Sequence, residues 1–102
     1  MMSAFELLSE PTRRRIIEEL ARGESPVGSL VDKLEMSQPA VSRQLRILRE
    51  SGIARVRRDG QRRIYRLDVE PLKELDQWLE QFRAYWEPRL DAMEKTLDSM
   101  ED

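Results

Sequence analysis

Apolar residues recur at steps of three and four along most of this chain, the spacing that places them on one face of a helix. Residues that start or stop helices divide the pattern into four short segments. The first helix is predicted over Ser3–Leu8, the second from a cap at Ser9 to Gly23, the third from Ser25 and Pro26, and the fourth from a cap at Ser37 to Ser51.

The pattern changes after Gly52. Two β-prone runs between Ile53 and Leu67 flank Asp59-Gly60, a dipeptide suited to a two-residue hairpin turn. Val56, Ile64, Tyr65 and Leu67 are expected to form the apolar side that holds this hairpin to the body of the protein.

A helical spacing returns after Asp68, which is predicted to cap a region that Pro71 enters near its start. Pro88 lacks an amide hydrogen and crowds the preceding turn, which predicts a kink or break near residues 83–87 and a final helix over 88–99. One long bent helix is the alternative. The fold class is therefore mainly α with a β-hairpin, in the order α-α-α-α-β-β-α. We expect one structural domain, with a core over residues 1–68 and helices for dimerisation over 69–102.

Charge is divided unevenly along this acidic chain. Residues 1–66 carry 14 Lys and Arg against 9 Asp and Glu, a net charge of +5, whereas residues 67–102 carry 4 against 11, a net charge of −7. Nine arginines and only two acids lie between Arg43 and Arg66. A basic segment of this kind favours a polyanionic partner, and the acidic end is expected to point away from it.

The fourth predicted helix presents polar residues suited to reading DNA bases. If Val41, Leu45 and Leu48 point inward, then Ser42, Arg43 and Arg46 lie on the opposite face and Gln38 lies at the N-terminal tip. Gln can pair with adenine and Arg with guanine in the major groove. An ordinary solvated helix is the alternative, but its outer face usually mixes Glu with Lys.

The hairpin carries six arginines: Arg55, Arg57, Arg58, Arg62, Arg63 and Arg66. Clustered like charges destabilise a small hairpin, so stability does not explain them. A wing that lies along a nucleic-acid backbone does, because arginine suits phosphate and narrow grooves. An edge strand protected from aggregation needs only one or two charges.

The run from Leu7 to Leu67 resembles the ArsR-type (arsenic-repressor-like) winged helix-turn-helix transcriptional regulators. The segments LLSEPTRRRIIEEL, SQPAVSRQLRILRESGI and RRDGQRRIYRL are similar to successive signatures of that family. The resemblance implies a homodimeric repressor, with the Ser37–Ser51 helix of each subunit in the major groove of half of a pseudo-palindromic operator.

The resemblance also implies roles for individual residues. Base readout falls to Ser37, Gln38, Ser42 and Arg43, and phosphate contacts to Arg46, Arg57, Arg58, Arg62 and Arg63. The first and last helices would form the dimer interface, through Phe5, Leu8, Leu75, Trp78, Leu79, Phe82, Trp86 and Leu90.

The chain departs from the members of this family that sense metals or oxidants. It has no cysteine and no histidine, so thiol chemistry and histidine-based metal sites are excluded, and no cofactor is expected. Ser25 and Pro26 stand where a thiolate ligand would be expected. Asp91, Glu94 and Asp98 could hold a hard cation weakly, but such a run is more often a solvated helix face.

Other functions receive less support from the sequence. The aromatics Trp78, Phe82, Tyr85 and Trp86 could line a pocket for a small apolar effector instead of a dimer interface. A winged-helix module that binds an acidic protein would use the arginines but not the Gln38 face. No nucleophile and base are grouped, so no enzyme is expected. No apolar run is long enough to span a membrane, which favours a cytoplasmic protein.

Overall fold

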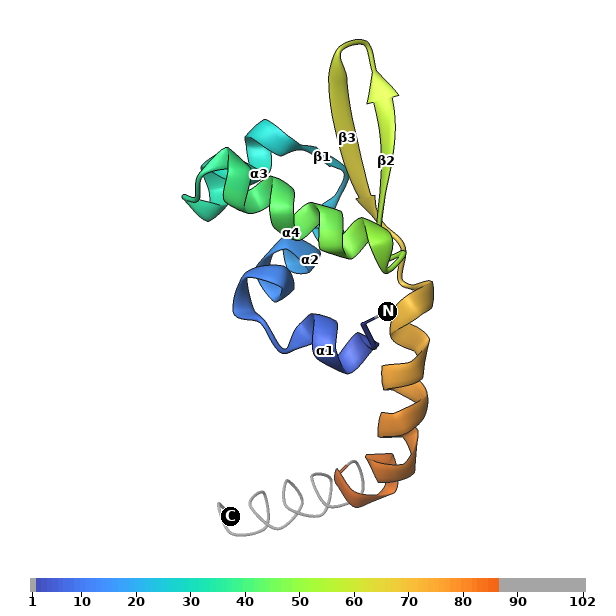
Figure 1. Cartoon of the computed structure of the whole chain (residues 1–102). Coiled ribbons are helices and arrows are strands. Elements are labelled where there is room, and N and C mark those ends of the chain that lie inside the picture. Colours follow the sequence, from blue (N-terminus) through green and yellow to red (C-terminus); the bar gives the residue numbers. More distant parts are fainter. Residues whose placement is uncertain (1, 87–102) are drawn as a thin grey trace, which may run out of the picture.

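The computed structural model describes residues 2–86, and the structural statements below concern these residues. Figure 1 shows a helical body from which a β-hairpin projects at one end and a long helix leaves at the other. The elements in order are α1 (Ala4–Leu8), α2 (Pro11–Arg22), β1 (Ser25–Pro26), α3 (Val27–Leu34), α4 (Gln38–Glu50), β2 (Ala54–Asp59), β3 (Arg62–Leu67) and a 3₁₀ turn (Glu70–Leu72). A C-terminal helix then occupies residues 73–86.

Side-chain caps begin three of the helices. Ser3 and Glu6 form a capping box at α1. The predicted cap at Ser37 is confirmed, because its hydroxyl accepts from the amide of Ala40 at the start of α4. The prediction of Ser9 as the cap of α2 is wrong. Glu10 is the cap instead, and its two carboxylate oxygens accept from the amides of Thr12 and Arg13, each at 3.1 Å.

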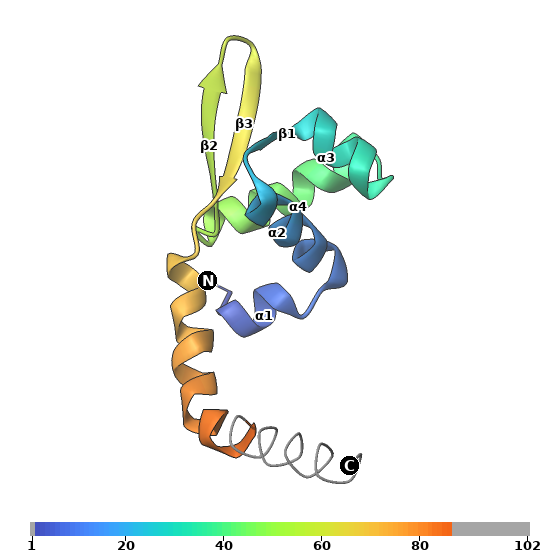
Figure 2. The same ribbon diagram turned by 180° about the vertical axis from the view of Figure 1, so that it is seen from behind.

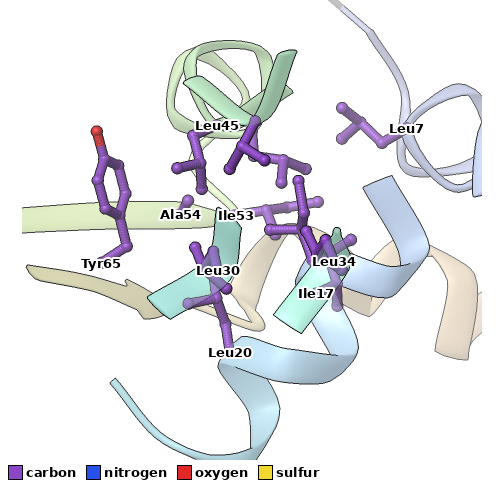
Figure 3. Packing of buried hydrophobic residues seen from close by; sticks show 12 residues of the cluster. Leu7, Ile17, Leu20, Leu30, Leu34, Leu45, Ile53, Ala54 and Tyr65 are labelled. Atoms are coloured by element: carbon purple, nitrogen blue, oxygen red, sulfur yellow. The ribbon is translucent and has the colours of Figure 1, made fainter. Parts of the chain in front are cut away.

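Helices α2, α3 and α4 enclose one core with the base of the hairpin (Figure 3). The predicted inner face of α4 is confirmed, because Val41, Leu45 and Leu48 have no exposed surface. Fully burying each such side chain contributes about 1.5–3 kcal/mol to folding. This burial fixes how α4 is rotated about its axis, and so determines which of its residues face solvent.

The hairpin forms as expected, with two corrections. Asp59 pairs with Arg62, so the two-residue turn is Gly60-Gln61 and not Asp59-Gly60. Gly60 adopts a φ of 64°, which favours glycine in that turn. A third strand, β1, was not predicted: Ser25 pairs with Tyr65 and Pro26 with Ile64.

Strand β3 therefore lies in the middle of a three-stranded antiparallel sheet, in the order β1-β3-β2. Ile64 and Tyr65 are both buried, although neighbours in a strand point to opposite faces. We call β2 and β3 together the wing, and its base is anchored on both faces.

The C-terminal helix leaves the body at the end opposite the tip of the wing, as both views show (Figures 1 and 2). The prediction of Asp68 as the cap of this region is wrong by one residue, because Val69 is the cap of the 3₁₀ turn; the Asp68 carboxylate still accepts from the amide of Glu70 at 3.0 Å. The predicted kink near Pro88, the final helix and Leu90 lie outside the described residues.

Candidate nucleic-acid interface

The first turns of α4 present polar side chains to solvent. Ser37, Gln38, Ser42, Arg43 and Arg46 are all exposed, on the side of the helix away from its buried face. The Ser37 cap, with Pro39 in the first turn, fixes where the helix begins. Gln38 is therefore held at the tip of the helix, where a side chain can reach furthest from the body.

Two hollows separate α4 from the wing, and Gln38 and Arg63 line both of them. One has a volume of about 430 Å³ and is lined by Val27, Gln38, Ser42, Arg46, Arg49, Arg63 and Tyr65. The other, about 550 Å³, extends to the start of α3 and the turn of the wing. Five of the predicted site residues therefore line these hollows, namely Gln38, Ser42, Arg46, Arg62 and Arg63, whereas Ser37, Arg43, Arg57 and Arg58 line neither.

Register divides the wing arginines between the two faces of the hairpin. Arg58 pairs with Arg63, two residues along from the Val56–Tyr65 pair, so these four residues share a face. Like charges directly opposite one another are unfavourable in a sheet. Within residues 2–86 neither Arg58 nor Arg63 forms an ion pair, so a positive charge concentrates there without compensation.

The other predicted phosphate contacts already have carboxylate partners. Arg57 pairs with Glu24 at 2.8 Å, Arg62 with Asp59 at 3.5 Å and Arg46 with Glu50 at 3.1 Å. The hydrogen bond from Arg57 lowers the pKa of Glu24 below its ordinary value. These pairs are exposed, and such pairs contribute little to stability, so a phosphate could replace each carboxylate.

The predicted dimer residues from α1 and the C-terminal helix form a continuous aromatic surface: Phe5, Trp78, Phe82 and Trp86. Successive ring centroids lie 5.6, 4.8 and 6.4 Å apart. Phe5, Trp78 and Trp86 remain 43–49% exposed, and Leu79 is also exposed, while Leu8, Leu75 and Phe82 are partly buried. Exposure to solvent alone does not explain why so many aromatic side chains gather on this surface.

Two arginines without a predicted role, Arg49 and Arg13, have distinct positions in the structure. Arg49 is exposed, lines the smaller hollow and lies seven residues after Ser42, a helical spacing that could have revealed it. Arg13 is buried, and precedes the buried Ile16 by three residues on α2. That spacing is a signal that could have placed Arg13 on the inner face of α2.

The model for "Bacterial regulatory protein, arsR family" matches residues 10–56 of this chain, from the cap of α2 into β2. The chain is 37% identical over 99 residues to the HTH-type transcriptional regulator Rv2034 of Mycobacterium tuberculosis, a match that covers 97% of this chain and 90% of the relative. The chain belongs to the ArsR family. It is also 30% identical to the transcriptional repressor SdpR of Bacillus subtilis, over 80% of this chain and 91% of that protein.

Solved structures agree. The crystal structure of a "Possible transcriptional regulator for arsenical resistance" superposes with a TM-score of 0.72 at 37% identity, covering 90% of this chain and 96% of that one. The protein is thus a winged-helix member of the ArsR family of DNA-binding transcriptional regulators and is not an enzyme.

Residues 2–86 of this ArsR regulator contain no group of three or more His, Cys, Asp or Glu residues placed to hold a metal ion. No helix in this part of the chain is both long and apolar enough to cross a membrane.

Proposed function

We propose that this protein is a cytoplasmic homodimer that represses transcription by occupying a pseudo-palindromic operator. Each subunit places α4 in the major groove of one half-site and the wing along the adjacent backbone or minor groove. The observation that carries this proposal is the position of Gln38 and Arg63 on the same two hollows, which joins the tip of α4 to the uncompensated charge of the wing.

Base readout is assigned to the exposed first turns of α4. Gln38 can donate to and accept from adenine in a bidentate pair, and Arg43 can donate twice to guanine. Ser42 can hydrogen-bond to several bases. Ser37 can still donate its hydroxyl hydrogen to the DNA, because only the hydroxyl oxygen is engaged, as acceptor from the amide of Ala40 at 3.3 Å.

Phosphate contacts are assigned in two grades. Arg58 and Arg63 bind phosphate directly, since no carboxylate within residues 2–86 competes for them. Arg46, Arg57 and Arg62 bind more weakly, because each must first leave its carboxylate partner. We add Arg49 to the first grade, because it is exposed and lies beside Arg63.

The aromatic surface is assigned to dimerisation, so that residues 1–68 serve as the DNA-binding core and residues 69–102 as the dimerising part. Trp and Phe bury large areas when they pair, which compensates for ordering two subunits. The C-terminal helix lies far from the wing in both views (Figures 1 and 2), which suits an acidic segment in a DNA-bound dimer. A small apolar effector bound among these rings is the competing use of the same surface.

Repression follows from steric exclusion, because a dimer that covers an operator blocks RNA polymerase. The chain has no cysteine or histidine, so we expect no release by thiol oxidation or by a histidine-bound metal. Dimerisation and operator binding both depend on protein concentration, which can then set occupancy without an inducer.

Selection from random DNA duplexes tests the proposal. The purified protein should enrich an imperfect palindrome with half-sites about one helical turn apart at moderate salt. A dimer that enriches no sequence, and has no duplex affinity even at low salt, would favour a module that binds an acidic protein.

A further inference from the structure

Arg13 is the only lysine or arginine among residues 2–86 that is buried, with 7% of its surface exposed. Removing a guanidinium from water is costly unless its donors find partners. No carboxylate within that range forms an ion pair with Arg13, although the charge of Glu10 interacts with it, and its guanidinium donates only to neutral acceptors. Arg13 is not among the residues assigned to bases or phosphates, so DNA binding does not explain why a guanidinium is buried at this position.

The three hydrogen bonds of Arg13 join two different helices. Its Nε donates to the carbonyl of Leu7 at 2.8 Å and its Nη2 donates to the carbonyl of Glu6 at 3.0 Å. These carbonyls lie in the last turn of α1, where helical acceptors lose their partners within the helix; the carbonyl of Glu6 also accepts from the amide and the hydroxyl of Ser9. The remaining nitrogen, Nη1, donates to Oε1 of Gln44 at 3.3 Å, on α4.

The other end of α1 is attached to the C-terminal helix. The amide of Ala4 donates to Oε1 of Glu74 at 2.6 Å, and the ring of Phe5 meets Trp78 edge-on at 5.6 Å. Helix α1 therefore connects the aromatic surface to Arg13, and Arg13 connects α1 to α4. Gln44, where this connection ends, directly follows Arg43.

We propose that Arg13 is a positioning residue that fixes the orientation of α4 relative to the aromatic surface. In a dimer formed through that surface, this orientation determines the distance and angle between the two recognition helices. Arg13 thereby sets the half-site spacing that the dimer accepts. The inference rests on the proposed function, in which α4 reads DNA and the aromatic surface dimerises.

The guanidinium suits this task because its donors diverge in a rigid plane. Lysine has a single nitrogen on a flexible stem and cannot hold the same three acceptors in one geometry. Arg14 is a natural control: it donates to the carbonyl of Leu8, at the same end of α1, but is exposed and forms no hydrogen bond or ion pair with α4 among residues 2–86. Comparing variants of Arg13 and Arg14 therefore distinguishes the effect of hydrogen bonds to α1 from the effect of the hydrogen bond to α4.

The experiment measures dissociation constants on two duplexes, one with the selected palindrome and one with a single half-site. Arg13→Met and Gln44→Met should each weaken palindrome binding about ten-fold, the equivalent of one hydrogen bond to a charged group. Half-site binding should change by less than about two-fold, since each α4 keeps its own contacts. Arg14→Met should leave the ratio of the two constants at the wild-type value.

Two further results complete the test. The double variant should bind the palindrome no more weakly than Arg13→Met alone, because both changes break one connection. Selection with Gln44→Met, which keeps both hydrogen bonds to α1, should accept a broader range of half-site spacings even if Arg13→Met is too unstable to purify.

Equal losses on palindrome and half-site would overturn the inference, since they would mean that Gln44 touches DNA or that α4 has simply lost stability. Unchanged spacing preference with Gln44→Met would overturn it as well. Failure of the wild-type protein to enrich any palindrome would instead refute the proposed function itself.

Discussion

Arg62 and Arg63 are neighbours in β3, yet we expect them to contribute differently to DNA binding. Arg63 has no ion pair among residues 2–86, lies opposite Arg58 and lines both hollows beside α4. Arg62 is held by Asp59 at 3.5 Å and lines only the larger hollow. Replacing each by alanine removes one positive charge from the same strand, so the pair forms a matched comparison.

The expected size of the effect follows from counterion release. Each phosphate contact contributes about 0.9 to the slope of log affinity against log salt, and a dimer contains two copies, so Arg63→Ala should flatten the slope by about 1.8. If the contribution vanishes near 1 M salt, the loss of affinity at about 0.1 M salt is roughly 60-fold. Arg62→Ala also removes the partner of Asp59 and should flatten the slope by less than about one unit.

Fluorescence anisotropy on a labelled duplex, over salt from about 50 to 200 mM, covers the range in which these slopes are measured. Both variants should lose affinity for cognate and unrelated duplexes alike, because phosphates carry no sequence. Equal slopes for the two variants, or a larger effect of Arg62→Ala, would refute the grading of wing arginines by their ion pairs.

The remaining predictions concern the wing, the core and the dimer. Glu24→Gln releases Arg57, and should tighten binding to any duplex and steepen the salt slope by about 0.9 per subunit in the same titration. The chain has no histidine, so duplex affinity should be constant between about pH 6 and 8. Because Arg57 lowers the pKa of Glu24, this carboxylate stays charged and paired even somewhat below its ordinary pKa; affinity should rise only as the pH falls through the lowered pKa and Glu24 is protonated, measured by anisotropy across pH. Leu45→Ala should lower the free energy of unfolding by about 2–5 kcal/mol in urea denaturation. Trp78→Ala should raise the dimer dissociation constant by about 30-fold in sedimentation experiments, and an unchanged constant would remove Trp78 from the interface.

Much of the helical architecture could be predicted because burial leaves a periodic trace. Val41, Leu45 and Leu48 recur at one helical spacing and are all fully buried. The cap at Ser37 was evident for a similar local reason, since its hydroxyl serves an amide three residues away. Interactions between residues that are close in the sequence can be predicted from the sequence itself.

Features that depend on partners far along the chain could not be predicted. Strand β1 has only two residues, too few for periodicity, and exists because β3 offers it hydrogen bonds. Glu24 and Arg57 are 33 residues apart, so their pairing follows from the fold and not from the sequence pattern. The turn was placed one residue early because Asp59-Gly60 is itself a good turn dipeptide, whereas pairing along the strands favoured Gly60-Gln61.

Base readout by α4 in a dimer is tested by selection from random duplexes with the Gln38→Ala variant. The variant should enrich the same palindrome with the same half-site spacing, but lose preference at one position in each half-site, at a cost of about 1–3 kcal/mol on the wild-type site. An unaltered preference, or a uniform loss of affinity for all duplexes like that of the Arg63→Ala variant, would contradict the assignment of Gln38 to base readout.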